Sequence, residues 1–354
     1  MRHPAGPKSS DSGLPRPSPV LALALVTVAA VLALVGCSGQ NGHVPHATSC
    51  NGAAALCSRR LDEVFFAGTH NSFAAADEPG WYFANQTYPI ARQLHDGIRA
   101  LLIDVHFGVE DPATGTVRTD LAAEGSDRNK VAEQIPRQAL KVADRVAGGI
   151  GLGDLHGVSE PYLCHTLCEL GAEPLVPELE VIRRFLDDHP NEVLIVIVED
   201  YVPPATIEPA FGEAGLTSYV ATLERHAPLP TLGELIQSGR RLLVFAEEKG
   251  GTPAWYMPAF SFIQDTPLGA LQPGQLSCAR YRGQQGDPLL LINHWIPPFP
   301  PSPTVNAQIG RAAFLRARIE RCTHERDIAG AMVAVDFYER TGVVDVARQL
   351  NERP

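Results

Sequence analysis

The sequence VLIVIVED at residues 193–200 decides the fold, because it ends an apolar, β-branched run with two carboxylates. Two other segments have the same form. FFAGTHNS at 65–72 and IRALLIDVH at 98–106 also lead from apolar residues to polar ones. Short runs rich in Val, Ile and Leu are typical of strands buried on both faces of a parallel sheet. The carboxyl ends of such strands lie at one edge, where α/β proteins keep their chemistry.

Further apolar runs follow the same rule and extend the predicted sheet. They occur at 242–246, 289–292 and 332–335, and helical patterns separate several of the runs. In residues 175–188, for example, apolar side chains recur at i, i+3 and i+4 spacing. Strands alternating with helices over about 300 residues predict an α/β protein with a distorted TIM (β/α)8-type barrel. A doubly wound open sheet is the alternative.

The composition changes along the chain in a way that indicates one large domain. We expect a signal segment at 1–37, a polar tether at 38–48 and a catalytic barrel at 49–354. Residues 109–158 have the character of an insertion, with a charged helical piece at 128–146 and a glycine run after it.

The charge balance excludes one class of partner. The chain of 354 residues has a formal net charge of −11 at pH 7, whereas a nucleic-acid-binding protein needs a basic face that matches phosphates. We therefore expect no nucleic-acid partner, and we expect any membrane affinity to come from an anchor. No coiled-coil pattern or repeat indicates assembly, so a monomer is the expected state.

The N-terminal residues indicate export. Three basic residues precede an uncharged apolar stretch at 20–35, which runs into the sequence LVGC at 34–37. A basic region, an apolar region and small residues before a processing site describe an export signal. LVGC resembles the bacterial lipobox, so Cys37 is the expected site of lipidation. The alternatives are simple secretion and an uncleaved anchor, although about 16 apolar residues fall short of the ~20 of a typical span.

Six cysteines remain after Cys37, and an even number in an exported chain predicts disulfides. Six cysteines allow about 15 pairings, and the sequence does not choose among them. Pairing of near neighbours favours Cys50–Cys57 and Cys164–Cys168, which leaves Cys278–Cys322. A zinc site is the alternative, but Cys-x3-Cys lacks a second matching ligand pair.

Side-chain alternation places candidate site residues on one face of the strand at 98–106. Leu102, Asp104 and His106 share that face, because successive strand side chains point to opposite sides. If the other face packs on the outer helices, Asp104 and His106 point into the barrel mouth. A structural role as a helix cap is the alternative for Asp104, and a structural hydrogen bond is the alternative for His106.

Two further histidines occupy positions suited to acid–base chemistry. His70 follows an apolar strand and the small residues Gly68 and Thr69, which permit a tight turn and leave space for a ligand near the backbone. His165 lies between two cysteines, so a bridged loop would hold its imidazole in place. One histidine can accept a proton while the other donates one near neutral pH.

Oxygen ligands and a few polar residues complete the predicted site. Cleavage of a phosphodiester needs a base, an acid and positive charge against the phosphate. The side chains of Asn71, Asp104 and Glu199 offer the oxygen donors that Ca²⁺ prefers. Together with the two histidines, they predict phosphodiester cleavage. Three further residues are candidates for substrate binding, namely His106, Lys249 and Asn293.

Several motifs in combination resemble the X-domain of phosphatidylinositol-specific phospholipase C, most nearly a plant and bacterial branch of X-domain-containing proteins. They are GTHNS at 68–72, GIR at 97–99, LCH at 163–165, FLDDHPNEV at 185–193, VEDYV at 198–202, INHW at 292–295 and VDFY at 335–338. The resemblance covers nearly all of residues 49–350. It implies a distorted TIM barrel that cleaves phosphoinositide, by attack of the inositol 2-hydroxyl on phosphorus, into diacylglycerol and a cyclic inositol phosphate.

The resemblance also assigns roles to residues of this chain. It implies that His70 and His165 are the catalytic histidines, with His70 nearer the leaving group. It implies that Asn71, Asp104 and Glu199 are calcium ligands, and that a phospholipid or an inositol phosphate is the substrate.

One position departs from the family pattern. The eukaryotic enzymes of the family have a glutamate two residues before the aspartate that Asp104 matches, and here that position is Leu102. Loss of one charged ligand predicts weaker binding of Ca²⁺, unless His106, Glu247 or water takes its place. The alternatives to the phospholipase are a phosphodiesterase for a different headgroup and a non-catalytic lipid-binding surface protein on the same barrel.

Overall fold

The computed structural model describes residues 47–150 and 157–353. The predicted signal segment, Cys37 and nearly all of the tether lie outside these residues. The described residues form one compact unit. Among the residues that the structure describes, no helix has both the length and the apolar character needed to cross a membrane.

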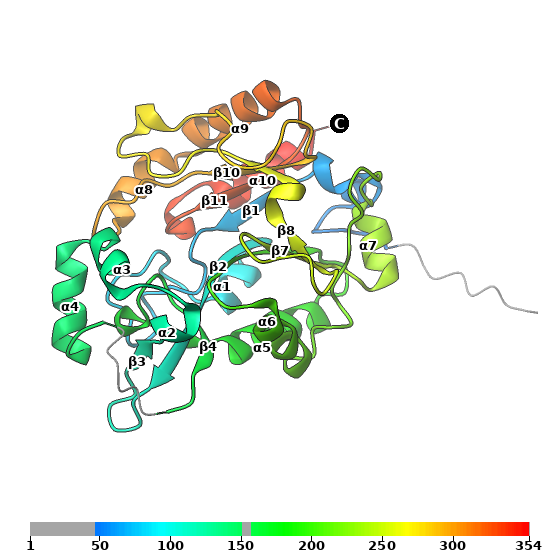
Figure 1. Ribbon diagram of the computed structural model, residues 1–354. Helices are drawn as coiled ribbons and strands as arrows, with labels where there is room; N and C mark the ends of the chain where they lie inside the picture. The colour runs from blue at the N-terminus through cyan, green and yellow to red at the C-terminus, as the bar shows by residue number, and fades with distance from the viewer. Residues whose placement is uncertain (1–46, 151–156, 354) are drawn as a thin grey trace, which may run out of the picture. The chain divides into compact units, whose positions relative to one another are not determined.

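A curled sheet of eight parallel strands organises this unit (Figure 1). The strands lie in the order β8-β7-β6-β2-β1-β11-β10-β9, and each is hydrogen-bonded to the next in this order. Within the described residues β8 and β9 do not pair, which leaves one open seam. The strands are β1 (Phe65–Thr69), β2 (Ala100–Glu110), β6 (Leu194–Asp200), β7 (Leu242–Ala246), β8 (Tyr256–Pro258), β9 (Ile263–Asp265), β10 (Leu289–Asn293) and β11 (Ala331–Val335).

This circular order confirms the predicted α/β fold of distorted TIM-barrel type. In a doubly wound sheet the strand order reverses direction at a switch point. Here β1 lies between β2 and β11, so the first and last strands are neighbours, as barrel closure requires. The doubly wound alternative is therefore wrong.

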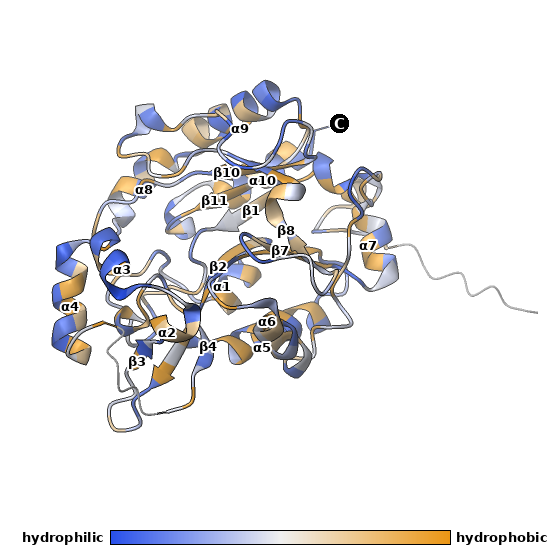
Figure 2. Ribbon diagram, in the orientation of Figure 1, coloured by the Kyte–Doolittle hydropathy of each residue, from blue (hydrophilic) through white to orange (hydrophobic). Residues whose placement is uncertain are grey.

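Helices cover the outer face of the sheet, and the side-chain alternation follows the prediction. Leu101 and Ile103 of β2 join the cluster that contains Leu179 and Ile182 of the predicted helix, whereas Leu102 joins the other cluster with Ile197. Figure 2 shows apolar residues concentrated on the central strands. The helices are α1 (Ile90–His95), α5 (Leu175–Asp188), α6 (Pro204–Glu213), α7 (Leu232–Ser238), α8 (Pro303–Ile309), α9 (Ala312–Arg326) and α10 (Val343–Asn351).

An inserted set of elements separates β2 from α5. Two of its strands pair antiparallel with the far end of β2. The inserted elements are β3 (Val117–Thr119), α2 (Leu121–Glu124), α3 (Arg128–Gln134), α4 (Arg137–Ala147), β4 (Glu160–Leu163) and β5 (Glu173–Pro174). The charged piece at 128–146 is thus two helices rather than one, because Pro136 and the extended residue before it interrupt the helix.

The structure contains the three disulfides that near-neighbour pairing favours. They are Cys50–Cys57, Cys164–Cys168 and Cys278–Cys322. The second of these closes the short loop that carries His165. The third fastens α9 to the segment that follows β9. Three disulfides fit an exported protein, because thiols stay reduced in the cytoplasm.

A buried histidine predicts a pH dependence of stability. His294 accepts a hydrogen bond at Nδ1 from Arg318 and donates from Nε2 to the Ile309 carbonyl, so the ring is neutral. Burial and the Arg318 charge lower the pKa of His294 to about 3 from the usual 6.5. Between these values the unfolded chain holds the extra proton, so the free energy of unfolding falls as the pH drops from 6.5 toward 3.

We expect His294→Asn to remove this part of the pH dependence. Denaturant titration measures the free energy of unfolding of both proteins. The difference between the parent and the variant should shrink by about 1.4 kcal/mol for each pH unit as the pH drops from 6 to 4. Parallel curves for the parent and the variant would show that His294 does not titrate in this way.

Candidate active site

The first part of the site is the turn after β1. Thr69 is fully buried, and its hydroxyl hydrogen-bonds the Ser72 hydroxyl and donates to Gln93 Oε1. Asn71 takes a positive φ of 45°, which the short amide side chain tolerates in a turn. The role predicted for Gly68 differs. A Cβ there would lie 3.1 Å from the Cβ of Ala100, so the glycine allows β1 and β2 to approach rather than leaving space for a ligand.

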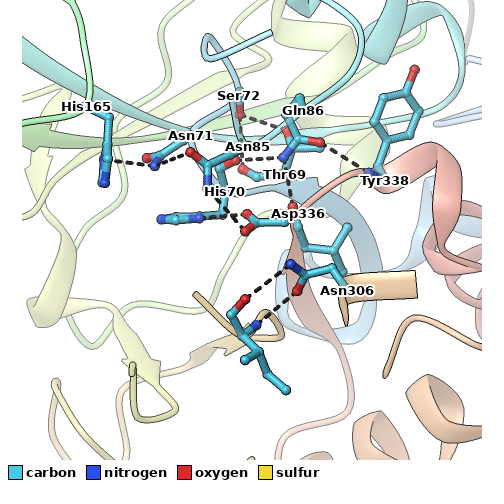
Figure 3. A network of polar contacts seen from close by, with 12 residues as sticks. Thr69, His70, Asn71, Ser72, Asn85, Gln86, His165, Asn306, Asp336 and Tyr338 are labelled. Carbon is cyan, nitrogen blue, oxygen red and sulfur yellow. Dashed lines mark hydrogen bonds and ion pairs between the residues drawn. The ribbon is translucent and has the colours of Figure 1, made fainter. Parts of the chain in front are cut away.

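His70 extends from this turn, and two neighbours fix its ring. Its Nδ1 lies 2.8 Å from Oδ1 of Asp336 (Figure 3). The ring also stacks on Trp295 at a centroid distance of 3.9 Å. Asp336 follows β11 directly, and the parallel pairing of β1 with β11 brings both residues to the same edge of the sheet. The carboxylate accepts the Nδ1 proton, which leaves Nε2 free to act on a substrate.

His165 faces His70 from the disulfide-closed loop. The two ring centroids are 6.2 Å apart, with the rings nearly perpendicular. Nδ1 of His165 lies 3.0 Å from Oδ2 of Asp104 and 2.9 Å from Nδ2 of Asn71. Asp104 is buried, whereas half of the His165 side chain is exposed. Each histidine therefore has a carboxylate at Nδ1, and both rings line one cavity.

The pKa of His165 is shifted upward. Loss of contact with water lowers this pKa, but the hydrogen bond and the charge of Asp104 outweigh that effect, and Glu199 and Asp336 add to them. The shift favours the protonated ring relative to a free imidazole, which suits a group that faces a negatively charged phosphate.

A small acidic pocket lies beside His70. Asp104 and Glu199 are register partners on the paired strands β2 and β6, and both line the pocket with Glu247. Burial and the charge of Asp104 raise the pKa of Glu199, whose Oε1 accepts a hydrogen bond from Tyr201. Burial also raises the pKa of Glu247 to about 7, although the nearby Arg282 opposes the shift.

A guanidinium supplies positive charge in the same pocket. Arg282, from the segment after β9, donates to Asp265 at 2.7 Å and to Glu247 at 2.5 Å, and stacks over the Phe260 ring. These two carboxylates hold the Arg282 side chain in place at the wall of the pocket.

Two of the predicted cation ligands, Asp104 and Glu199, line the acidic pocket, whereas Asn71 is not among the residues that line it. Asn71 and Asp104 both lie beside Nδ1 of His165. The oxygen donors of the three residues are of the kind that Ca²⁺ prefers. Asp104 and Glu199 provide carboxylate oxygens, and Oδ1 of Asn71 is buried with no hydrogen-bond partner among the described residues. Leu102 lines the pocket where the family pattern has a glutamate. Within residues 47–150 and 157–353, no group of three or more His, Cys, Asp or Glu side chains is arranged to hold a metal ion. Calcium usually takes six to eight oxygens, so water and substrate would have to complete this set.

The three predicted substrate-binding residues have different surroundings. Asn293 lines the acidic pocket and donates to Asp265 and to the Thr266 carbonyl. His106 is buried instead, because the inserted helix α2 covers that end of β2. Its Nδ1 lies 2.9 Å from Oε1 of Glu124, and its ring stacks on Tyr201. The Lys249 ammonium donates to the Tyr201 carbonyl. Neither His106 nor Lys249 is among the residues that line the acidic pocket.

Sequence reasoning missed three residues of this site: Asp336, Trp295 and Arg282. For Asp336 a signal was present, because it follows the apolar run at 332–335 as Asp104 and Glu199 follow theirs. Trp295 and Arg282 lie beyond strand ends in loops, and no periodic pattern marks such positions.

Comparison with known proteins matches the chain to one protein family. The sequence pattern of the family PI-PLC X 1 matches residues 132–351. The PI-PLC X domain-containing protein 1 of the fungus Arthroderma benhamiae is 25% identical over 323 residues, which are 85% of this chain and 89% of the relative. A second A. benhamiae relative, an uncharacterized secreted protein, is 26% identical, and the match covers 62% of this chain and 40% of that protein.

Solved structures are more distant. The phosphatidylinositol-specific phospholipase C from Listeria monocytogenes aligns over 84% of this chain and 98% of its own, with 15% identity and a TM-score of 0.47.

Proposed function

The chain belongs to the PI-PLC X family, and from this membership we propose that it is a phosphoric diester hydrolase of the phospholipase C type. One observation carries the proposal. His70 and His165 face each other across 6.2 Å, and each has a buried carboxylate at Nδ1. This arrangement orients two Nε2 atoms toward one substrate group.

The reaction follows from the roles that two such histidines can take. The substrate is phosphatidylinositol, and its inositol 2-hydroxyl attacks phosphorus. One histidine accepts the hydroxyl proton while the other protonates the departing glycerol oxygen, so a P–O bond forms to the ring as the P–O bond to diacylglycerol breaks. The products are diacylglycerol and a cyclic inositol phosphate. The acidic pocket holds the polar headgroup, with Asn293 and Arg282 at its wall.

We assign a Ca²⁺ site to Asn71, Asp104 and Glu199. When bound, the ion would offset the negative charge that grows on the phosphate oxygens. Leu102 leaves this site one charged ligand short, so we expect weaker binding than a complete acidic set would give.

The calcium assignment predicts that Glu199→Gln weakens binding of Ca²⁺ about tenfold or more, because it removes one of two charged ligands. Isothermal titration of the protein with CaCl₂ measures the dissociation constant directly. Glu248→Gln is the matched control, since Glu248 is an exposed neighbour of the pocket residue Glu247. Equal dissociation constants for the parent and Glu199→Gln would disprove the assignment.

The test of the proposed function is hydrolysis of phosphatidylinositol in mixed micelles by the full-length protein, followed by phosphorus NMR with added Ca²⁺ and with chelator. We expect a cyclic inositol phosphate in the presence of Ca²⁺. If the protein cleaves another phosphodiester and not phosphatidylinositol, the substrate carries a different headgroup from the one proposed. Folded protein that binds the micelles and yields no phosphorus product would favour the second candidate, a lipid-binding surface protein, for which Leu102 is the motivating feature.

We further propose that the protein acts outside the cytoplasm, held at the membrane by lipid on Cys37. The three disulfides and the basic and apolar N-terminal sequence support export. Metabolic labelling with a fatty acid tests the anchor, and Cys37→Ala should abolish the label.

A further inference from the structure

A second and larger cavity meets the acidic pocket at His70. This groove, of about 370 Å³, is also lined by His165, so the two histidines form part of its wall. Its other lining residues come from three segments: Trp81, Phe83 and Asn85 after β1; Gln134, Ile135, Pro136, Ala139, Thr166, Leu167 and Leu170 of the insertion; and Tyr201, Pro297, Pro298, Phe299 and Pro301 beyond β6 and β10.

The groove and the acidic pocket differ in chemistry. Asp, Glu, Lys and Arg are absent from the described residues that line the groove, whereas Asp104, Glu199, Glu247 and Arg282 line the pocket. The active-site histidines therefore lie where an apolar cavity adjoins a charged one.

Packing within the insertion and the proline-rich segment forms the groove walls. Ile135 and Ala139 are buried in one apolar cluster with Leu167 and Leu170, which gives that wall a fixed shape. The opposite wall is the segment after β10, and its Phe299 contacts Phe83 at a ring distance of 4.5 Å.

We propose that this groove binds a hydrocarbon chain of the departing half of a lipid phosphodiester. The inference rests on the proposed function. A phosphodiester has two substituents, and the histidines act on the phosphorus between them. The polar substituent suits the acidic pocket, which leaves the apolar substituent on the other side of His70, where the groove begins.

Binding of a hydrocarbon chain in the groove predicts how kcat/KM depends on the chain length of soluble substrates. Consider inositol phosphodiesters whose departing alcohol is methanol, butanol or octanol. Each methylene that enters the groove should raise kcat/KM by up to about fourfold. If the departing alcohol faced water instead, kcat/KM would not change with chain length.

Phe299→Asp tests the wall directly, because it places a charge where the chain would lie. In the parent, kcat/KM should be higher for the octyl diester than for the methyl diester. We expect the ratio of these two values to be at least tenfold smaller in Phe299→Asp. Phe314→Asp is the matched control, since Phe314 has the same exposed fraction of 37% and lies outside the groove. A second pair is Gln134→Trp, which places a bulky ring at an exposed position of the groove wall, and Gln138→Trp, the same change at an exposed position outside the groove.

A measurement without turnover separates this inference from the proposed function. A polyene fatty acid, whose fluorescence rises in apolar surroundings, should bind the parent and both controls, and bind Phe299→Asp and Gln134→Trp at least tenfold more weakly. If no diester is cleaved but this binding pattern holds, the groove assignment stands and the hydrolase proposal fails. Cleavage with the same chain-length dependence in all folded proteins would overturn the groove assignment, as would equal probe binding, which would point to another occupant.

Discussion

His165→Ala is expected to lower kcat for phosphatidylinositol by roughly 10²- to 10⁴-fold, the range typical of a lost proton-transfer group. The reason is positional. His165 faces His70 at 6.2 Å, and Asp104 fixes its Nδ1, so no other described side chain of the site stands ready to exchange a proton there. Initial rates at saturating substrate, by phosphorus NMR, measure the effect.

A control separates loss of this group from general damage. His95→Ala removes a histidine whose side chain is 78% exposed and should leave kcat unchanged. If His165→Ala retains kcat within a few-fold of the parent while its fold is intact, His165 has no part in proton transfer.

Asp336→Asn is expected to lower kcat by roughly 10³- to 10⁴-fold, comparable to loss of the orienting aspartate in serine proteases. Asn85 donates to Oδ2 of Asp336, so the amide oxygen of the new asparagine would take that side. Its NH₂ group would then face Nδ1 of His70, which must become an acceptor. The proton would move to Nε2, and the ring would lose its basic nitrogen on the substrate side.

This outcome has a spectroscopic signature. Nitrogen NMR of the histidine side chains should show His70 change from the Nδ1–H to the Nε2–H tautomer in Asp336→Asn, which a merely structural role would not produce. Asp345→Asn, on an exposed residue of α10, is the control. An unchanged tautomer together with nearly full activity would show that Asp336 does not orient His70.

The sheet could be predicted largely because its strands are buried on both faces. The runs at 242–246, 289–292 and 332–335 correspond closely to β7, β10 and β11. Strands β8 and β9 were not predicted, since each has only three residues and shows no apolar run. The order of the strands depends on pairing over long sequence distances, such as that of β1 with β11, which local pattern does not encode.

Part of the site could also be predicted, because polar residues at the ends of buried parallel strands meet at one edge of the sheet. Asp104 and Glu199 end apolar runs, and parallel pairing makes them direct neighbours. His106 obeys the alternation rule too, but helix α2 of the insertion brings Glu124 to its Nδ1 and buries it. The partnership of His70 with Asp336 spans most of the chain, so it becomes visible only when β1 and β11 are paired.

The central claim is that His70 and His165 act together on one phosphodiester. The most direct test is a double-mutant cycle, with kcat measured for His70→Ala, His165→Ala and the double variant on phosphatidylinositol. Groups that act as one unit are strongly non-additive. We predict that the double variant loses little more activity than the more damaged single variant. Losses that multiply, or a double variant that keeps its activity, would contradict the account.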